Sequence, residues 1–111
     1  MSILGDLDMT IPGPPFKNSE HFGWAFQSLN TMRQQAMLTD VIVTAGNRKI
    51  KAHRVVLASA SPYFYAMFTG DLSESRQEII VLKEIDPKAL ELLIEYCYKA
   101  EVQVNEENVQ V

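Results

Sequence analysis

The segment 52–76 constrains the fold most strongly, because it is a long apolar stretch of helical character that a single proline interrupts. Ser61 can cap a new helix, and Pro62 is tolerated at the first helical position, where its missing N–H is not needed. Gly70 is a suitable helix end. The segment is therefore predicted to form two short helices, over 53–60 and from 62 to about 70, that lead into an acidic and polar loop.

The sequence before this segment predicts a helix and a hairpin. Apolar residues spaced by three and four positions indicate one stripe on a helix that runs over 19–38. The β-branched run 40–45 and the alternating run 48–52 flank Gly46 and Asn47, which favour a tight turn.

The sequence after the segment predicts a buried third strand over 78–82. Asp86 and Pro87 resemble a second helix start, and the inner face of that helix is expected to carry Leu90, Leu93, Ile94 and Cys97. A brief edge strand at 102–104 and a helix that starts at Asn105 are expected to follow. Because only a little more than one helical turn remains after Asn105, we expect the sequence to be a fragment or a truncated form.

Composition narrows the class of protein. The chain has 111 residues with a formal charge of −4, and no cluster of Lys and Arg of the kind that binds nucleic acid. Cys97 is the single cysteine, so no disulfide within the chain is expected, which is typical of a reducing compartment. No signal peptide and no apolar run of roughly 20 residues is found, so no membrane partner is expected. Residues 1–18 are rich in Gly and Pro and are predicted to form a flexible leader.

Several motifs resemble a BTB (POZ) domain of the kelch-like type. Residues 38–41 (L-T-D-V) resemble the L-C-D-V strand opening of that family, and residues 52–58 match its A-H-R-x-V-L-A. Residues 61–69 match S-P-Y-F-x-A-M-F-T, and residues 72–75 resemble the M-x-E-S loop that follows. The resemblance implies an α+β BTB/POZ fold, with a small three-stranded sheet, flanking helices and an N-terminal dimerisation helix. The domain is expected to cover 19–111 and to be incomplete at its C-terminal end.

The resemblance also implies two contact surfaces. The apolar stripe of the first helix is expected at a homodimer interface, with burial within the same chain as the alternative; its residues are Phe22, Trp24, Phe26, Leu29 and Met32. A second surface is expected to contact a cullin scaffold through Tyr65, Phe68, Leu72 and Glu74. Asp40 and Arg54 occupy the positions of a charged pair in the family. We expect this pair to satisfy its own charges beneath the surface, and direct partner recognition is the alternative.

Catalytic, cofactor and metal sites are not expected. His21 and His53 have no nucleophile in a matching motif, and the two histidines and Cys97 lack the spacing of metal ligands. The predicted function is a homodimeric substrate adaptor of a cullin-RING ubiquitin ligase, which would bind its substrates through downstream domains that are missing here. The alternative is a self-association module of a transcription repressor or a cytoskeletal, actin-binding scaffold. We expect a cytoplasmic location, with a cytoskeletal or nuclear one as alternatives.

Overall fold

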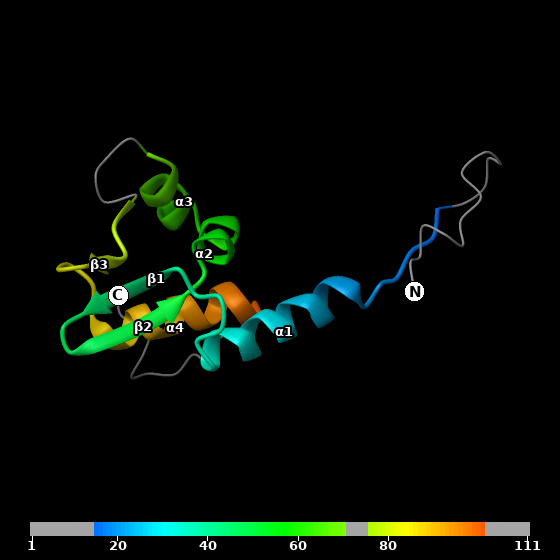
Figure 1. Ribbon diagram of the computed structural model, residues 1–111, viewed down its shortest axis with the longest axis horizontal. Helices are drawn as coiled ribbons and strands as arrows, with labels where there is room; N and C mark the ends of the chain where they lie inside the picture. Colours follow the sequence, from blue (N-terminus) through cyan, green and yellow to red (C-terminus); the bar gives the residue numbers. More distant parts are fainter. Residues whose placement is uncertain (1–14, 71–75, 102–111) are drawn as a thin grey trace.

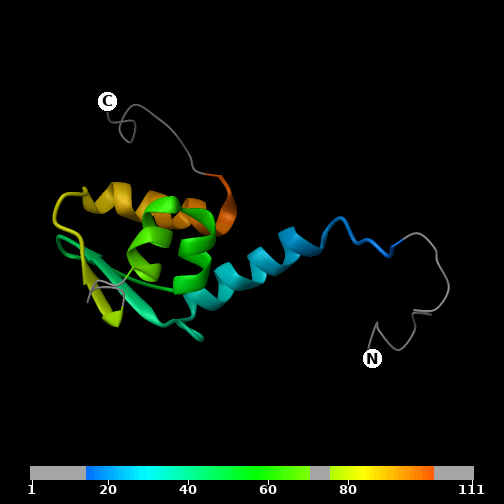
Figure 2. The ribbon, with the colours of Figure 1, turned by 90° about the horizontal axis from the view of Figure 1, so that it is seen from above.

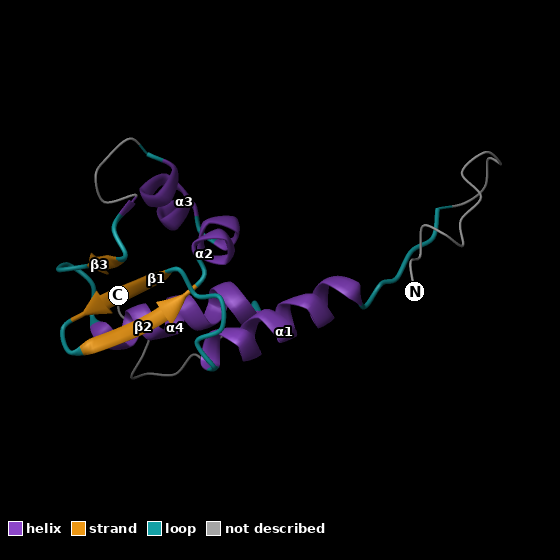
Figure 3. Cartoon of the chain, in the orientation of Figure 1, coloured by secondary structure: helices purple, strands orange, loops and turns teal. Residues whose placement is uncertain are grey.

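The computed structural model describes residues 15–70 and 76–101, which form three strands and four helices. Figures 1 and 3 show a small sheet with helices packed around it. In chain order the elements are α1 (His21–Gln34), β1 (Val41–Ala45), β2 (Arg48–Ala52), α2 (Arg54–Ala60), α3 (Pro62–Thr69), β3 (Ile79–Val81) and α4 (Pro87–Lys99). The predicted α+β arrangement of a small three-stranded sheet with flanking helices is confirmed. The predicted strand at 102–104 and the helix from Asn105 lie outside the described residues, as does most of the predicted leader.

The sheet has the strand order β2-β1-β3. β1 is antiparallel to β2, with Val41 opposite Ala52, and parallel to β3, with Ile42 opposite Ile79. Gly46 turns the β1–β2 hairpin with a φ of 56°, and a Cβ at this position would lie 2.9 Å from the Cγ of Pro87. The hairpin therefore needs glycine both for its backbone conformation and for its contact with the start of α4.

β3 is less buried than the sequence predicts. Ile80 is buried, but Ile79 and Val81 are 51% and 61% exposed. β3 is an edge strand of the sheet, and alternate residues of a strand point to opposite faces, so its two outer residues face away from the core. The prediction of a strand here is confirmed, whereas the prediction that it is buried is wrong for these two residues.

Both predicted helix starts that combine a cap with proline are confirmed. The Ser61 hydroxyl accepts a hydrogen bond from the backbone N–H of Phe64 at 3.3 Å. The Asp86 carboxylate accepts from the N–H groups of Lys88 and Ala89 at 3.0 and 3.1 Å. Each side chain satisfies N–H groups that have no partner within the helix, so the caps fix where α3 and α4 begin.

α1 ends four residues earlier than the apolar spacing predicts. Ala36 and Leu38 have φ angles of 54° and 60°, in the left-handed region, and so they break the helix after Gln34. The N–H of Met37 donates to the carbonyl of Met32 at 2.8 Å, which closes the last turn. The helical spacing of apolar residues continues past the point where the backbone leaves the helix. This spacing alone therefore predicted a helix that is too long.

The core lies between the sheet and the helices α2, α3 and α4. Phe64, Leu57, Leu90, Ile94 and Val43 are its largest fully buried side chains. α1 contacts α4 and β2, and its N-terminal half extends away from the body of the domain (Figure 2). Of the predicted inner face of α4, Leu90, Ile94 and Cys97 are buried and Leu93 is partly buried, while Tyr98 is a further core residue that the sequence reasoning did not include.

A hydrogen-bonded pair, His53 and Tyr98, joins several elements inside the fold. The Tyr98 hydroxyl accepts from the backbone N–H of His53 at 2.9 Å and lies 2.7 Å from its Nδ1. His53 Nε2 lies 2.9 Å from the carbonyl oxygen of Met37. All three contacts are satisfied when neutral His53 carries its proton on Nε2, donates to Met37 and accepts from Tyr98. The pair thus connects α4, the start of α2 and the loop between α1 and β1.

Removing the Tyr98 hydroxyl should destabilise the fold. Tyr98→Phe keeps the ring but leaves the buried backbone N–H and Nδ1 of His53 without this partner, which we expect to cost about 1–3 kcal/mol of unfolding free energy. Denaturant unfolding measures this loss. Tyr96→Phe, on the same helix but 47% exposed, is the matched control and should change the free energy by less than about 0.5 kcal/mol. Equal stabilities of the two variants would contradict the role of the pair.

The same hydroxyl should make stability sensitive to alkaline pH. Burial raises the pKa of Tyr98 from 10.0 to about 12, although the His53 hydrogen bond and the Arg33 charge oppose this shift. Because the pKa is raised in the folded state, the contribution of the neutral hydroxyl is present below pH 10 and is lost as the pH rises from 10 towards 12. The difference in unfolding free energy between wild type and Tyr98→Phe should shrink over this interval. A difference that stays constant would contradict the assignment.

Candidate functional site

α3 presents aromatic side chains on more than one side. Phe64 is fully buried and stacks on Phe68, with ring centroids 5.8 Å apart and an interplanar angle of 9°. Tyr63 and Tyr65 are 52% and 59% exposed. Of the two predicted contact residues on this helix, Tyr65 is exposed and Phe68 is partly buried.

Two of the four residues predicted to contact a cullin lie outside the described residues. They are Leu72 and Glu74, in the segment 71–75. The described residues on either side are Gly70, which follows α3, and Arg76, which precedes β3. The described part of this predicted surface therefore consists of Tyr65 and Phe68 on α3.

The structure brings Asp40 and Arg54 together through backbone groups. The Asp40 carboxylate accepts from the backbone N–H of Arg54 at 2.7 Å, and Nε of Arg54 donates to the backbone carbonyl of Asp40 at 3.3 Å. Asp40 is exposed and Arg54 is partly buried, so the expectation of a pair beneath the surface is wrong for Asp40. Its carboxylate instead satisfies the first N–H of α2.

The Arg54 side chain also reaches two elements far from it in sequence. Its guanidinium carbon lies 5.1 Å from the centroid of the Phe68 ring, within the range of a cation–π interaction. Its Nη2 donates to the backbone carbonyl of Gln77, just before β3. Arg54 therefore touches the end of α3 and the entrance of β3, the two flanks of the segment 71–75.

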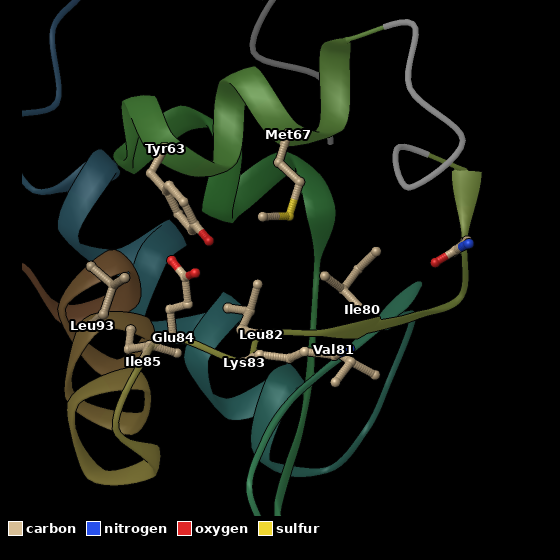
Figure 4. A pocket seen from close by; sticks show the side chains of 10 residues that line it. Tyr63, Met67, Ile80, Val81, Leu82, Lys83, Glu84, Ile85 and Leu93 are labelled. Atoms are coloured by element: carbon tan, nitrogen blue, oxygen red, sulfur yellow. The ribbon is translucent and has the colours of Figure 1, made fainter.

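An apolar groove lies on another side of α3. Tyr63 and Met67 line it from α3, and Ile80, Leu82, Ile85 and Leu93 line it from β3, the following loop and α4 (Figure 4). Glu84 and Lys83 place charges at this groove. The groove and the Tyr65 side of α3 are thus two distinct surfaces of one helix.

The residues predicted at a dimer interface fall into two groups. Phe22 and Trp24 are 78% and 66% exposed on the part of α1 that extends from the body (Figure 1). Phe26 and Leu29 are partly buried and pack against the core of their own chain, and Met32 is also partly buried. Burial within the chain therefore accounts for part of the apolar stripe, and the N-terminal end of the helix keeps its aromatic side chains in solvent.

The surroundings of the histidine, cysteine and acidic side chains bear on metal binding and nucleophilic chemistry among the described residues. Among them, no group of three or more His, Cys, Asp or Glu side chains is placed to hold a metal ion. Burial raises the pKa of the Cys97 thiol, which opposes formation of a nucleophilic thiolate. Both ring nitrogens of His53 are already engaged. None of the helices in the described ranges is long and apolar enough to cross a membrane.

Sequence reasoning missed Tyr98 and two of the contacts that Arg54 makes. Tyr98 lies four residues after Ile94 and eight after Leu90, so the helical period of α4 could have placed it on the inner face. The contacts of Arg54 with Phe68 and Gln77 join positions 14 and 23 residues away along the chain, and no local pattern predicts them.

Comparisons with known proteins agree on one family. The sequence model of the BTB/POZ domain matches residues 29–111. The chain is 52% identical over 94 residues to human kelch-like protein 3 and 52% identical over 98 residues to human kelch-like protein 2, which covers 85% and 88% of this chain. It spans only 16% of the length of either relative. Among solved structures, the BTB domain of zebrafish PATZ1 matches with a TM-score of 0.74 and 26% identity, over 86% of this chain and 76% of that one.

Proposed function

Because the chain belongs to the BTB/POZ domain family, we propose that this protein-interaction module acts as a homodimeric adaptor that binds a cullin scaffold. The likeness to kelch-like proteins 2 and 3 supports this assignment. The observation that carries it is the exposed aromatic surface of α3, where Tyr65 remains 59% exposed beside the partly buried Phe68. Exposed aromatic side chains on a rigid element are typical anchors of protein interfaces.

The proposed mechanism is positional. An adaptor raises the local concentration of a substrate near the transferring enzyme, and it needs no catalytic group of its own. Substrates would be bound by domains outside this chain, which spans 16% of the length of its kelch-like relatives.

The proposed cullin contact combines α3 with the segment that follows it. Tyr65 and Phe68 lie three residues apart and therefore on neighbouring positions of one helical face. Leu72 would add an apolar side chain, and Glu74 a charged hydrogen-bond acceptor at the rim. This combination of an apolar centre and a polar rim is the usual anatomy of a specific interface.

The proposed dimer contact uses α1. Phe22 and Trp24 are large apolar side chains held in water by a helix that extends from the domain, and a second copy could cover both helices symmetrically. A groove between α1 and α4 continues this surface, with Phe22, Phe26, Tyr96 and Cys97 among its lining residues. A two-fold contact would therefore bury the exposed end of α1 against aromatic surface.

A self-association module without a ligase role is the second candidate. The exposed end of α1 favours it, because self-association alone would explain Phe22 and Trp24. This candidate gives Tyr65 no function. Cullin binding therefore separates the two candidates.

Replacing Phe22 by Asp should prevent dimer formation without unfolding the chain. Its side chain is 78% exposed, so a charge there costs the monomer little but would be buried without a partner in the dimer. Sedimentation should show a dimer for wild type and a monomer for Phe22→Asp. Val81→Asp, at a 61% exposed position on β3, is the control and should remain dimeric. Trp24, the single tryptophan, should become less accessible to a fluorescence quencher as wild type associates. A dimeric Phe22→Asp variant would contradict the assignment of α1 to the interface.

Replacing Tyr65 by Ala should weaken binding to the N-terminal region of a cullin at least about tenfold, or about 1.4 kcal/mol. Leu72→Asp and Glu74→Ala should have effects of similar size. Tyr63→Ala is the matched control, because Tyr63 lies on the same helix with a similar exposure but faces the groove. Titration calorimetry measures the four affinities against wild type. If wild type and Tyr65→Ala bound equally well, the proposed contact would be wrong, and absence of binding by wild type would favour the self-association module.

A further inference from the structure

We propose that Arg54 is a positioning residue, which holds the end of α3 and the entrance of β3 in the relative arrangement that the partner contact needs. This inference rests on the proposed cullin contact for its functional meaning. The geometry that supports it lies entirely within described residues, and it assigns to the Asp40–Arg54 pair a role that differs from mutual charge neutralisation.

Three contacts of one guanidinium group carry the inference. Its carbon lies 5.1 Å from the ring centroid of Phe68, in the last turn of α3. Its Nη2 donates to the carbonyl of Gln77, two residues before β3, and its Nε donates to the carbonyl of Asp40, just before β1. A single side chain at the start of α2 thus contacts α3 and the backbone that enters two neighbouring strands.

The base of Arg54 is fixed as well. Its own backbone N–H donates to the Asp40 carboxylate at 2.7 Å, so the Cα of Arg54 is held against the start of β1. Side chain and main chain of Arg54 therefore bond to the carbonyl and the carboxylate of the same residue. This second attachment makes Arg54 a rigid support, because the side chain starts from a fixed point.

Arginine is suited to this task and lysine is not. A guanidinium group is planar and presents several N–H donors in a fixed fork, so it can donate to two carbonyls while its face lies on an aromatic ring. A lysine ammonium keeps the charge, but as a compact group on a flexible stem it cannot reproduce all three contacts. Arg54→Lys therefore tests whether the shape of the guanidinium group is needed or its positive charge is enough.

The contacts of Arg54 affect both flanks of the segment 71–75, which carries Leu72 and Glu74. Phe68 precedes this segment, and it is also one of the proposed contact residues. Gln77 follows the segment. Because Arg54 touches both flanks, it fixes their separation before a partner arrives, which reduces the ordering cost of binding. Loss of the three Arg54 contacts should therefore weaken binding to the cullin. Every side chain of the proposed cullin contact remains present, and only Phe68 is held less firmly.

Amide hydrogen exchange tests the positioning role without any partner. In Arg54→Lys, the amides of Phe68, Thr69 and Ile80 should exchange at least about fivefold faster than in wild type, because local opening becomes easier. The amides of Val43 and Ile94, in the core, report global unfolding and should change less. Arg48→Lys is the matched control, since Arg48 is an exposed arginine paired with Glu91 elsewhere on the surface, and it should leave all five amides unchanged.

Cullin binding supplies the second measurement on the same variants. Arg54→Lys should lower the affinity about fivefold or more while Arg48→Lys binds like wild type. Unchanged exchange at the three flank amides in Arg54→Lys would overturn the positioning role whatever the affinities are. Equal affinities of wild type and Arg54→Lys would overturn its functional part. Faster flank exchange in a protein whose wild type binds no cullin would instead contradict the proposed function and support the positioning role alone.

A second variant covers the case in which Arg54→Lys fails to fold. Phe68→Leu removes the ring beneath the guanidinium group but keeps an apolar side chain at the end of α3. If the ring helps to hold Arg54, exchange at Ile80, on a different element, should become faster in this variant too. Wild-type exchange at Ile80 in Phe68→Leu would contradict the coupling between the two flanks.

Discussion

The hydrogen-bonded pair of His53 and Tyr98 is the contact on which the arrangement of the helices depends. His53 lies where β2 passes into α2, and Tyr98 lies near the end of α4, 45 residues later. The opposite ring nitrogen of His53 bonds to the carbonyl of Met37, which the left-handed turn after α1 presents. Because all these polar groups are buried or partly buried, each contact satisfies a group that would otherwise lack a partner inside the fold.

The two proposed interaction surfaces are connected to the His53–Tyr98 pair at different places. Arg33 of α1 lies over the ring of Tyr98, with its guanidinium carbon 4.8 Å from the ring centroid, and so the C-terminal half of α1 is fixed while Phe22 and Trp24 remain outside. Arg54 follows His53 directly and reaches to α3. His53 and Arg54, at the start of α2, therefore connect the contacts that hold the proposed dimer surface to the contacts that hold the proposed cullin surface.

Local sequence signals predicted the elements well, because caps and alternation act over a few residues. Ser61 and Asp86 each cap the helix that the sequence assigned to them, and Gly46 turns the predicted hairpin. The end of α1 was missed because two non-glycine residues adopt positive φ angles, which apolar spacing does not report. Of the candidate site, the exposure of Tyr65 and the meeting of Asp40 with Arg54 followed from the resemblance, whereas the contact of Arg54 with Gln77 depends on tertiary packing alone.

Nuclear magnetic resonance of the amide groups during titration with a cullin N-terminal region tests the central claim most directly, because it maps the contact residue by residue. The account predicts that the largest shift changes lie at Tyr65, Phe68 and Gly70 on one flank and at Arg76 and Glu78 on the other. The amides around Trp24 in α1 should change little. Changes confined to α1 or to the groove around Leu93, or no changes at all, would contradict the claim that α3 and the segment that follows it form the partner contact.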